Sequence, residues 1–187
     1  PFAAKRETDL PAPLSPYAVA KLAGEHYCQA FYRTYGLETV GLRYFNVFGP
    51  RQDPDSPYSA VIPIFITRLL ADNPPIIYGD GGQTRDFAYV ANVVHGNLLA
   101  ADSQGAAGQV LNIANGKATS LLELIAALNR LLGTKVTPIF EAARAGDVRD
   151  SMADISRAQK ILGYIPPVDF ETGLSQSIEY YKSMVNV

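Results

Sequence analysis

The sequence contains one cysteine, Cys28, among its 187 residues, so no disulfide can form within the chain. A single thiol agrees best with a reducing compartment, and we expect a cytoplasmic protein. The longest apolar stretches, such as 60–65 and 121–128, fall far short of the ~20 residues that a bilayer span needs. The sequence therefore predicts no membrane anchor.

No region of the sequence has a cluster of charges of one sign. The net charge is −2, and the lysines and arginines are scattered, which leaves no basic patch for nucleic acid or an anionic membrane. His26 and His95 are far apart in the sequence, and neither stands with Asp, Glu or Cys at the spacing of metal ligands. No nucleophile elbow is present. We predict no nucleic-acid partner, no membrane partner and no metal site.

Hydrophobic residues make up 48% of the chain, which is enough for a packed core without a metal or a disulfide. Strand-like segments alternate with helical ones, a pattern typical of an α/β fold. Pro63 is expected to break the second helix early. We predict helices over 17–35, 60–71, 90–101, 120–132, 155–162 and 170–185, and strands over 38–45, 75–78, 85–89, 109–114 and 135–140.

Tyr17 and Lys21 stand four residues apart on the first predicted helix, so both lie on one face, ~6 Å apart along the axis. A free tyrosine has a pKa of about 10, and a tyrosine base near neutral pH needs ~4 kcal/mol of added phenolate stabilisation. A neighbouring ammonium group and an oxidised nicotinamide ring are positive charges that could supply it. An aromatic side chain packed beside a solvated lysine has the same spacing, so the pair alone leaves a structural role open.

The segment around this pair, 15–25 (SPYAVAKLAGE), resembles the active-site helix of the extended short-chain dehydrogenase/reductase family, in particular its NAD-dependent epimerases and dehydratases. The resemblance implies an NAD cofactor, with Tyr17 and Lys21 as catalytic residues that also contact the cofactor. It further implies an α/β fold: the C-terminal part of a doubly wound, Rossmann-type sheet joined to a smaller α/β substrate-binding domain.

The segment 42–50 (LRYFNVFGP) is the second landmark of the resemblance. In the family this strand end faces the nicotinamide and the substrate. The resemblance implies that Tyr44 and Val47 contact the cofactor and that Asn46 contacts the nucleotide diphosphate-sugar. A buried strand that ends in an Asn-containing turn explains the same residues without a ligand.

Two later segments, 75–87 (PIIYGDGGQTRDF) and 144–149 (RAGDVR), extend the resemblance to a nucleotide site. It implies that Arg85 and Arg144 grip the diphosphate, and a guanidinium offers a planar fork that matches phosphate oxygens. The alternative for Arg85 is an exposed ion pair with Asp80 or Asp86, which would contribute little. The other substrate contacts that the resemblance implies are Ile76 and Tyr78 beside the nucleobase, Asp147 at the ribose or uridine hydroxyls, and Ala60 and Val61.

The glycine-rich strand-turn-helix fingerprint that receives the pyrophosphate of NAD in this family is absent from the sequence. We therefore expect the C-terminal part of a longer enzyme, without tight NAD binding or turnover on its own. Residues 1–50 are predicted to be the remnant of the NAD-binding domain with the active-site helix. Residues 51–187 are predicted to form mostly the sugar-nucleotide-binding domain, with a strand and helix near 75–114 interleaved with the NAD domain.

Within the family, the segments 51–54 (RQDP) and 144–153 most resemble UDP-hexose 4-epimerases. Ser151 matches a gate position in those enzymes, and its small side chain predicts that N-acetylated sugars are admitted alongside UDP-glucose and UDP-galactose. A dTDP- or GDP-sugar 4,6-dehydratase and a UDP-glucuronate decarboxylase remain alternatives, as does a non-catalytic nucleotide-sensing or RNA-binding relative. The complete enzyme is expected to be a homodimer, because family members often pair the first helix with its copy.

Overall fold

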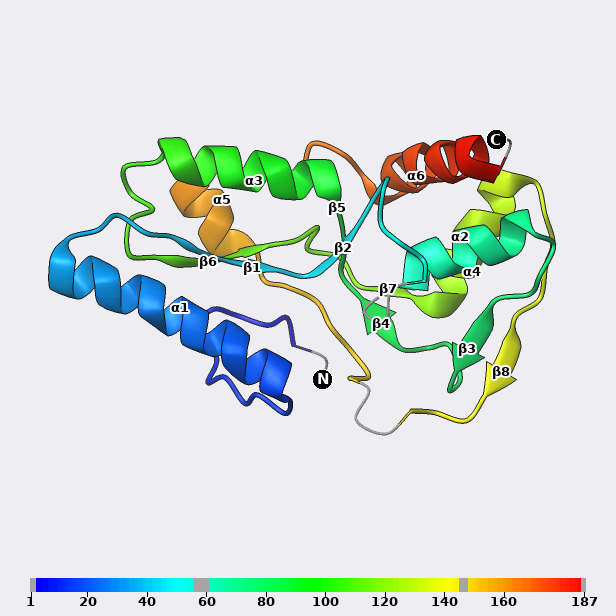
Figure 1. Cartoon of the computed structure of the whole chain (residues 1–187), viewed down its shortest axis with the longest axis horizontal. Helices are drawn as coiled ribbons and strands as arrows, with labels where there is room; N and C mark the ends of the chain where they lie inside the picture. Colours follow the sequence, from blue (N-terminus) through cyan, green and yellow to red (C-terminus); the bar gives the residue numbers. More distant parts are fainter. Residues whose placement is uncertain (1–2, 56–60, 145–147, 186–187) are drawn as a thin grey trace.

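The computed structural model describes residues 3–55, 61–144 and 148–185, in which helices and strands alternate along the chain (Figure 1). This alternation confirms the predicted α/β class. The helices are α1 (Pro16–Tyr35), α2 (Val61–Leu70), α3 (Val90–Asp102), α4 (Leu121–Leu132), α5 (Ser156–Leu162) and α6 (Phe170–Val185). The strands are β1 (Gly41–Tyr44), β2 (Asn46–Phe48), β3 (Ile76–Tyr78), β4 (Thr84–Arg85), β5 (Phe87–Tyr89), β6 (Val110–Ile113), β7 (Thr119–Ser120) and β8 (Ile139–Glu141).

The described strands associate in pairs instead of one continuous doubly wound sheet. β1 runs parallel to β6, β2 parallel to β5 and β3 parallel to β8, while β4 and β7 are antiparallel. β1 and β2 follow each other directly, and the partner changes between them. The Phe45 N–H donates to the Ile113 carbonyl at 3.4 Å, and the Asn46 N–H donates to the Asp86 carbonyl at 3.1 Å. Open α/β sheets bind ligands beyond the carboxyl ends of their parallel strands. The change of partner lies at the carboxyl end of β1.

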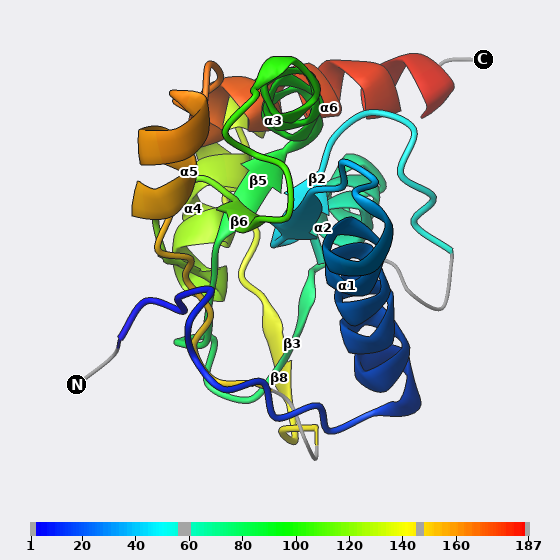
Figure 2. The same ribbon diagram turned by 90° about the vertical axis from the view of Figure 1, so that its left-hand side faces the viewer.

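Helices cover both faces of the β1–β6 pair. Figure 1 shows α3 and α5 on one side and α1 on the other, and the turned view in Figure 2 agrees. The α3 and α5 side is a true core, in which Leu111, Ile113 and Tyr164 are fully buried. In contrast, α1 has no buried residue along its 20 residues.

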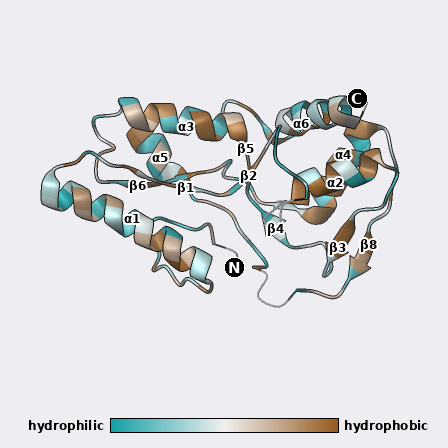
Figure 3. Ribbon diagram, in the orientation of Figure 1, coloured by the Kyte–Doolittle hydropathy of each residue, from teal (hydrophilic) through white to brown (hydrophobic). Residues whose placement is uncertain are grey.

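A larger core lies between α2, α4, α6 and β5. It contains the fully buried Phe48, Ile66, Leu124 and Leu174. Figure 3 shows hydrophobic residues along α2, whereas α1 alternates between hydrophilic and hydrophobic residues. This core holds in place the strands that carry most of the predicted nucleotide contacts.

Four sequence predictions need correction. Pro63 does not break α2, because it stands at the third helical position, where a backbone N–H has no partner within the helix. The strand predicted over 85–89 is interrupted at Asp86, the strand over 38–45 begins only at Gly41, and β8 is confined to Ile139–Glu141. Thr119–Ser120 forms a strand that was not predicted. No helix among the described residues is long and apolar enough to cross a membrane.

Candidate functional site

The first helix presents Tyr17 and Lys21 together, as their spacing predicts. Ser15 caps the helix, since its hydroxyl accepts from the Ala18 N–H at 3.2 Å, and Pro16 occupies the first helical position. The Lys21 ammonium nitrogen lies 5.2 Å from the centre of the Tyr17 ring. Tyr17 is 66% exposed, so its phenol is open to a ligand.

A cavity of about 670 Å³ lies beside this pair. Tyr17 and Lys21 line it from α1, Arg43 and Tyr44 line it from β1, and the loop 11–13 closes one side. The Tyr44 hydroxyl donates to Asn97 Oδ1 at 2.9 Å, which fixes the ring at the end of β1. Three polar groups of the kind that bind a ribose or a sugar hydroxyl therefore border one open space.

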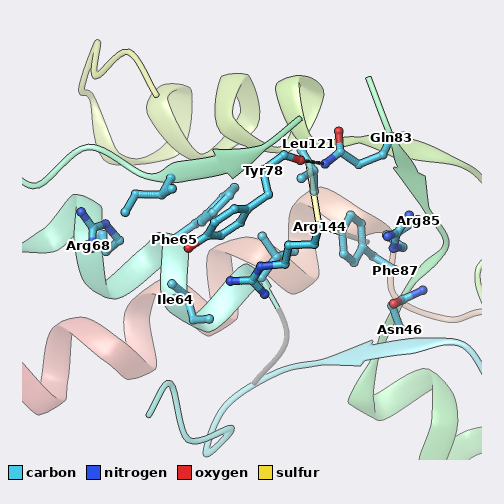
Figure 4. Close-up of a pocket in the computed structure, with 12 residues that line it drawn as sticks. Asn46, Ile64, Phe65, Arg68, Tyr78, Gln83, Arg85, Phe87, Leu121 and Arg144 are labelled. Atoms are coloured by element: carbon cyan, nitrogen blue, oxygen red, sulfur yellow. Dashed lines mark hydrogen bonds between the residues drawn. The ribbon is translucent and has the colours of Figure 1, made fainter. Parts of the chain in front are cut away.

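A second cavity, of about 360 Å³, gathers six of the residues predicted to contact substrate (Figure 4). They come from four separate parts of the chain, so only the fold brings them together. The residues that line this cavity are Asn46, Val61, Ile64, Phe65, Arg68, Ile76, Tyr78, Gln83, Arg85, Phe87, Leu121 and Arg144.

Positive charge and a flat aromatic surface meet in this second cavity. The guanidinium carbon of Arg144 lies 3.7 Å from the centre of the Tyr78 ring, a cation–π contact that Figure 4 shows. Arg85 donates from Nη1 to the carbonyls of Thr84 at 2.8 Å and Arg149 at 3.3 Å. Such a cavity suits a ligand that has both a planar ring and anionic oxygens.

Two further polar residues of this cavity were missed by sequence reasoning. Arg68 donates from Nε to the Pro74 carbonyl at 2.8 Å, and Gln83 donates from Nε2 to the Tyr78 carbonyl at 2.7 Å. Arg68 stands in the apolar helix α2, and only the folded position of that helix turns it toward the cavity. Gln83 stands two residues before Arg85 in the segment 75–87, and this position was the one sequence signal that could have identified it.

Asp86, beside the cavity residue Arg85, joins β5 to two distant segments of the chain. Its fully buried carboxylate accepts from the N–H groups of Asn115 at 2.8 Å, Gly116 at 3.0 Å and Ala153 at 3.1 Å. Burial raises the pKa of this carboxyl, and the three N–H donors partly offset that effect. Because the Asp86 carbonyl also accepts the Asn46 N–H, this residue fixes the place of Asn46.

The exposed alternative for Arg85 requires Asp80 or Asp86 as a partner. Asp80 instead receives two hydrogen bonds from Arg149, at 3.1 and 2.9 Å, which lower the pKa of Asp80. The carboxylate of Asp86 is turned to backbone N–H groups in the interior.

The remaining predicted site residues either line neither of these two cavities or lie outside the described residues. Val47 packs against the core around β6 and lines neither cavity. Ser151 is half-buried, and its N–H donates to the Thr84 carbonyl at 3.2 Å, outside the lining of both cavities. Ala60 and Asp147 lie outside the described residues. No group of three or more His, Cys, Asp or Glu side chains in the described part of the chain could hold a metal ion.

The structure does not place Tyr17 and Lys21 in the same cavity as Arg85 and Arg144. The change of partner between β1 and β2 lies between the residues that line the two cavities, because Tyr44 lines the first cavity and Asn46, two residues later, lines the second. A ligand long enough to extend past these two residues would reach both sets of side chains.

Comparison with known structures shows the same fold in sugar-nucleotide epimerases. UDP-glucose 4-epimerase from Thermotoga maritima, solved with UDP-glucose, matches 99% of this chain and 59% of its own chain, with a TM-score of 0.93 and 39% identity. UDP-N-acetylglucosamine 4-epimerase from Methanobrevibacter ruminantium matches 95% of this chain and 57% of its own, with a TM-score of 0.90 and 41% identity.

UDP-glucuronic acid 4-epimerase from Bacillus cereus, solved with UDP-glucuronic acid and NAD, matches 98% of this chain and 58% of its own, with a TM-score of 0.89 and 37% identity. The chain spans about half the length of the curated relatives that it matches. The model of the NAD dependent epimerase/dehydratase family matches residues 1–114. Since that match covers more than half of the sequence, this chain belongs to the NAD dependent epimerase/dehydratase family.

Proposed function

We propose that residues 1–187 contribute the nucleotide-sugar pocket and the acid–base pair of an NAD-dependent UDP-hexose 4-epimerase. The observation that carries the proposal is the pairing of two sites. One cavity is lined by Tyr78, Arg85 and Arg144 and another by Tyr17 and Lys21, and residues 44 and 46 of neighbouring strands line one cavity each. Because the chain spans about half the length of its relatives, we propose the activity for an enzyme that contains this chain.

The second cavity fits the nucleoside diphosphate. The Tyr78 ring offers a flat surface for the uracil, and the guanidinium groups of Arg85 and Arg144 offer forks for the two phosphates. Arg144 now covers the Tyr78 ring, so a base that takes this face displaces it, and the freed guanidinium can turn to a phosphate. Asn46 lines this cavity two residues after Tyr44, and we assign it to the sugar end of the substrate.

The first cavity fits the nicotinamide and ribose end of NAD. The Tyr17 hydroxyl, the Lys21 ammonium and the Tyr44 hydroxyl are polar groups that could hold ribose and substrate hydroxyls. When bound, NAD supplies an acceptor, and later a donor, for the hydride at C4 of the sugar. The sequence lacks the glycine-rich turn that binds the pyrophosphate, so we propose that this part of the cofactor is held outside residues 1–187.

The chemistry asked of this chain is a proton transfer at one oxygen. Tyr17, as phenolate, takes the proton from the 4-hydroxyl of the sugar, and the same residue returns it after the sugar has turned its other face. Lys21 stabilises the phenolate by its charge and by its place on the same face of α1. The exposure of Tyr17 supports this role, since a base must be reachable.

The test is turnover of UDP-glucose and UDP-galactose by the enzyme that contains this chain. Tyr17→Phe should lower kcat by at least ~10²-fold with little change in KM, because it removes the proton acceptor alone. Tyr180→Phe is the matched control: it makes the same change on α6, at a residue that lines neither cavity. Activity that survives Tyr17→Phe, or that falls equally in both variants, would contradict the proposal.

We also propose that the small Ser151 side chain admits N-acetylated UDP-hexoses. In the complete enzyme, Ser151→Tyr should impair turnover of the N-acetylated pair more than that of UDP-glucose and UDP-galactose. Equal loss on both pairs would count against a gate at this position.

The active form is proposed to be a homodimer that pairs α1 with its copy. Tyr27, Phe31 and Tyr35 expose aromatic rings at helical spacing on α1, and such a row suits an interface. Sedimentation of the complete enzyme would test the dimer, and a monomer at working concentration would exclude it.

We propose, too, that residues 1–50 belong to the NAD-binding domain and that most of 51–187 forms the sugar-nucleotide domain.

A further inference from the structure

We propose that Arg43 is a positioning residue that keeps Lys21 available to Tyr17 by holding the carboxylate of Glu25. This inference rests on the proposed function, in which Tyr17 and Lys21 are the acid–base pair. It adds to that function the reason why the lysine remains beside the tyrosine.

The first observation is a two-point ion pair between α1 and β1. Arg43 donates from Nε to one carboxylate oxygen of Glu25 at 2.7 Å and from Nη2 to the other at 2.8 Å. The side chains are only 28% and 14% exposed, so water and salt screen the pair weakly. The hydrogen bond to Glu25 is the main reason that the pKa of Arg43 is raised. Both oxygens of Glu25 are therefore committed to Arg43.

The second observation is the position of Lys21 relative to Glu25. Residues four apart on a helix are surface neighbours, and a free carboxylate there attracts an ammonium group. In the described part of the chain Lys21 forms no ion pair, and its ammonium lies 5.2 Å from the Tyr17 ring centre. With Arg43 in place, the carboxylate that could draw Lys21 one turn away from Tyr17 is already neutralised.

The charged groups that face this ion pair come from three segments. Lys21 and Glu25 project from α1, Arg43 from β1, and Glu7 and Asp9 lie in the N-terminal segment and act on Arg43 by their charge. Arg43 also donates from Nη1 to the Glu7 carbonyl at 3.5 Å. Loss of Arg43 leaves a mostly buried carboxylate without its partner, and Lys21 is then the nearest cation on the same helix.

A purely structural tether is the competing explanation, because α1 has no buried residue to hold it. Two other contacts fasten the helix further along: the Thr39 hydroxyl donates to the Cys28 carbonyl at 2.7 Å, and the Tyr32 ring lies against Gly108. Neither involves the charge of Glu25. A structural tether and an Arg43 that neutralises Glu25 therefore make different predictions when the charge of Glu25 is removed.

The test measures the pH profile of kcat for UDP-glucose in the enzyme that contains this chain, for Arg43→Gln, Glu25→Gln and the double variant. Arg43→Gln should lower kcat at pH 7 by roughly tenfold and move the acid limb about one pH unit upward, because Lys21 turns to the free carboxylate. The double variant should regain most of the lost activity, since the carboxylate that attracts Lys21 is gone. Glu25→Gln alone should lower kcat less than Arg43→Gln, with KM nearly constant.

A double variant as impaired as Arg43→Gln would overturn the inference, and so would an acid limb that does not move in Arg43→Gln. If Arg43→Gln fails to fold, Glu25→Gln alone decides the question. A loss of kcat of roughly tenfold or more in Glu25→Gln would indicate a structural tether and would contradict the proposal. Failure of the proposed function is distinguishable, because activity would then survive Tyr17→Phe whatever the result at Arg43.

Discussion

The core around α2, α4 and α6 and the helix α1 are held in place in different ways. The core is built on side chains such as Ile66, Leu124 and Leu174 that have no exposed surface. In contrast, α1 has no buried side chain. Its contacts include the ion pair of Glu25 with Arg43, the hydrogen bond from the Thr39 hydroxyl and the packing of the Tyr32 ring against Gly108. The proposed nucleotide cavity, lined by Tyr78, Arg85 and Arg144, therefore lies against a fully buried core, whereas the proposed acid–base pair lies on a helix without buried residues.

This contrast agrees with the division of labour that we propose. A pocket that binds by shape and charge gains from walls that do not move. A helix that must meet a cofactor and a second subunit needs an exposed face, and its position can then be set by a few polar contacts. Substitutions on the two sides should consequently differ in their effect on the free energy of unfolding.

The largest difference is expected between a core leucine and an exposed aromatic residue. Leu124→Ala should lower the free energy of unfolding by about 2–5 kcal/mol, because it opens a cavity at a fully buried position. Phe31→Ala, on α1 at 45% exposure, should cost about 1 kcal/mol or less. Urea unfolding of both variants measures this, and equal losses would break the comparison.

The second effect concerns the buried carboxylate of Asp86, which accepts from three backbone N–H groups. Asp86→Asn should cost about 1–3 kcal/mol, because the amide turns an N–H toward backbone donors and leaves one unpaired. Asp80→Asn, at the exposed pair with Arg149, is the control and should cost less.

The pH dependence at Asp86 has a defined sign. Burial raises its pKa, so the folded chain binds this proton more tightly than the unfolded chain. The free energy of unfolding should fall as pH rises from the ordinary carboxyl pKa through the raised one. Asp86→Asn lacks this titration, so the advantage of the unsubstituted chain should shrink across that window. An advantage that grows with pH there would contradict the account.

A third comparison tests the contact between α1 and the sheet with two glycines of similar backbone. Gly108 has φ of +74° and Gly133 has φ of +71°. A Cβ at Gly108 would lie 2.3 Å from the Tyr32 ring, while nothing lies within 4 Å of one at Gly133. Gly133→Ala should cost about 1 kcal/mol of backbone strain, and Gly108→Ala roughly 2 kcal/mol. Faster amide exchange at the end of α1 in Gly108→Ala alone would locate the difference.

The smallest effect is expected on the open face of α1. Gly24 lies inside the helix, and no atom stands within 4 Å of an added Cβ. Gly24→Ala should raise the free energy of unfolding by up to ~1 kcal/mol, because alanine is the better helix former. A loss of stability would show that this face is more crowded than α1 suggests.

Local signals predicted the elements that local chemistry controls. The N-cap Ser15 and the residues after it fixed where α1 begins, and Gly36, with φ of +68°, ends the helix in a left-handed conformation. The capping box between Ser120 and Glu123 likewise fixes the start of α4. Six residues that the family resemblance predicted to contact substrate line one cavity.

Features that depend on distant segments could not be predicted. The interruption at Asp86 arises because its carboxylate turns inward to Asn115, Gly116 and Ala153, and no local pattern reveals those partners. The position of Arg68 at the cavity depends on how α2 packs against the core, and that of Gln83 on its hydrogen bond to the Tyr78 carbonyl. The short β8 depends on pairing with β3 more than on its own sequence.

The most direct test of the division of labour is a calorimetric titration of UDP into the 187-residue chain. The account predicts that the chain binds UDP, that Arg144→Ala weakens binding by about tenfold, and that Tyr17→Phe leaves the Kd unchanged. If UDP does not bind, or if Tyr17→Phe weakens binding as much as Arg144→Ala, the two cavities do not have the separate roles proposed for them.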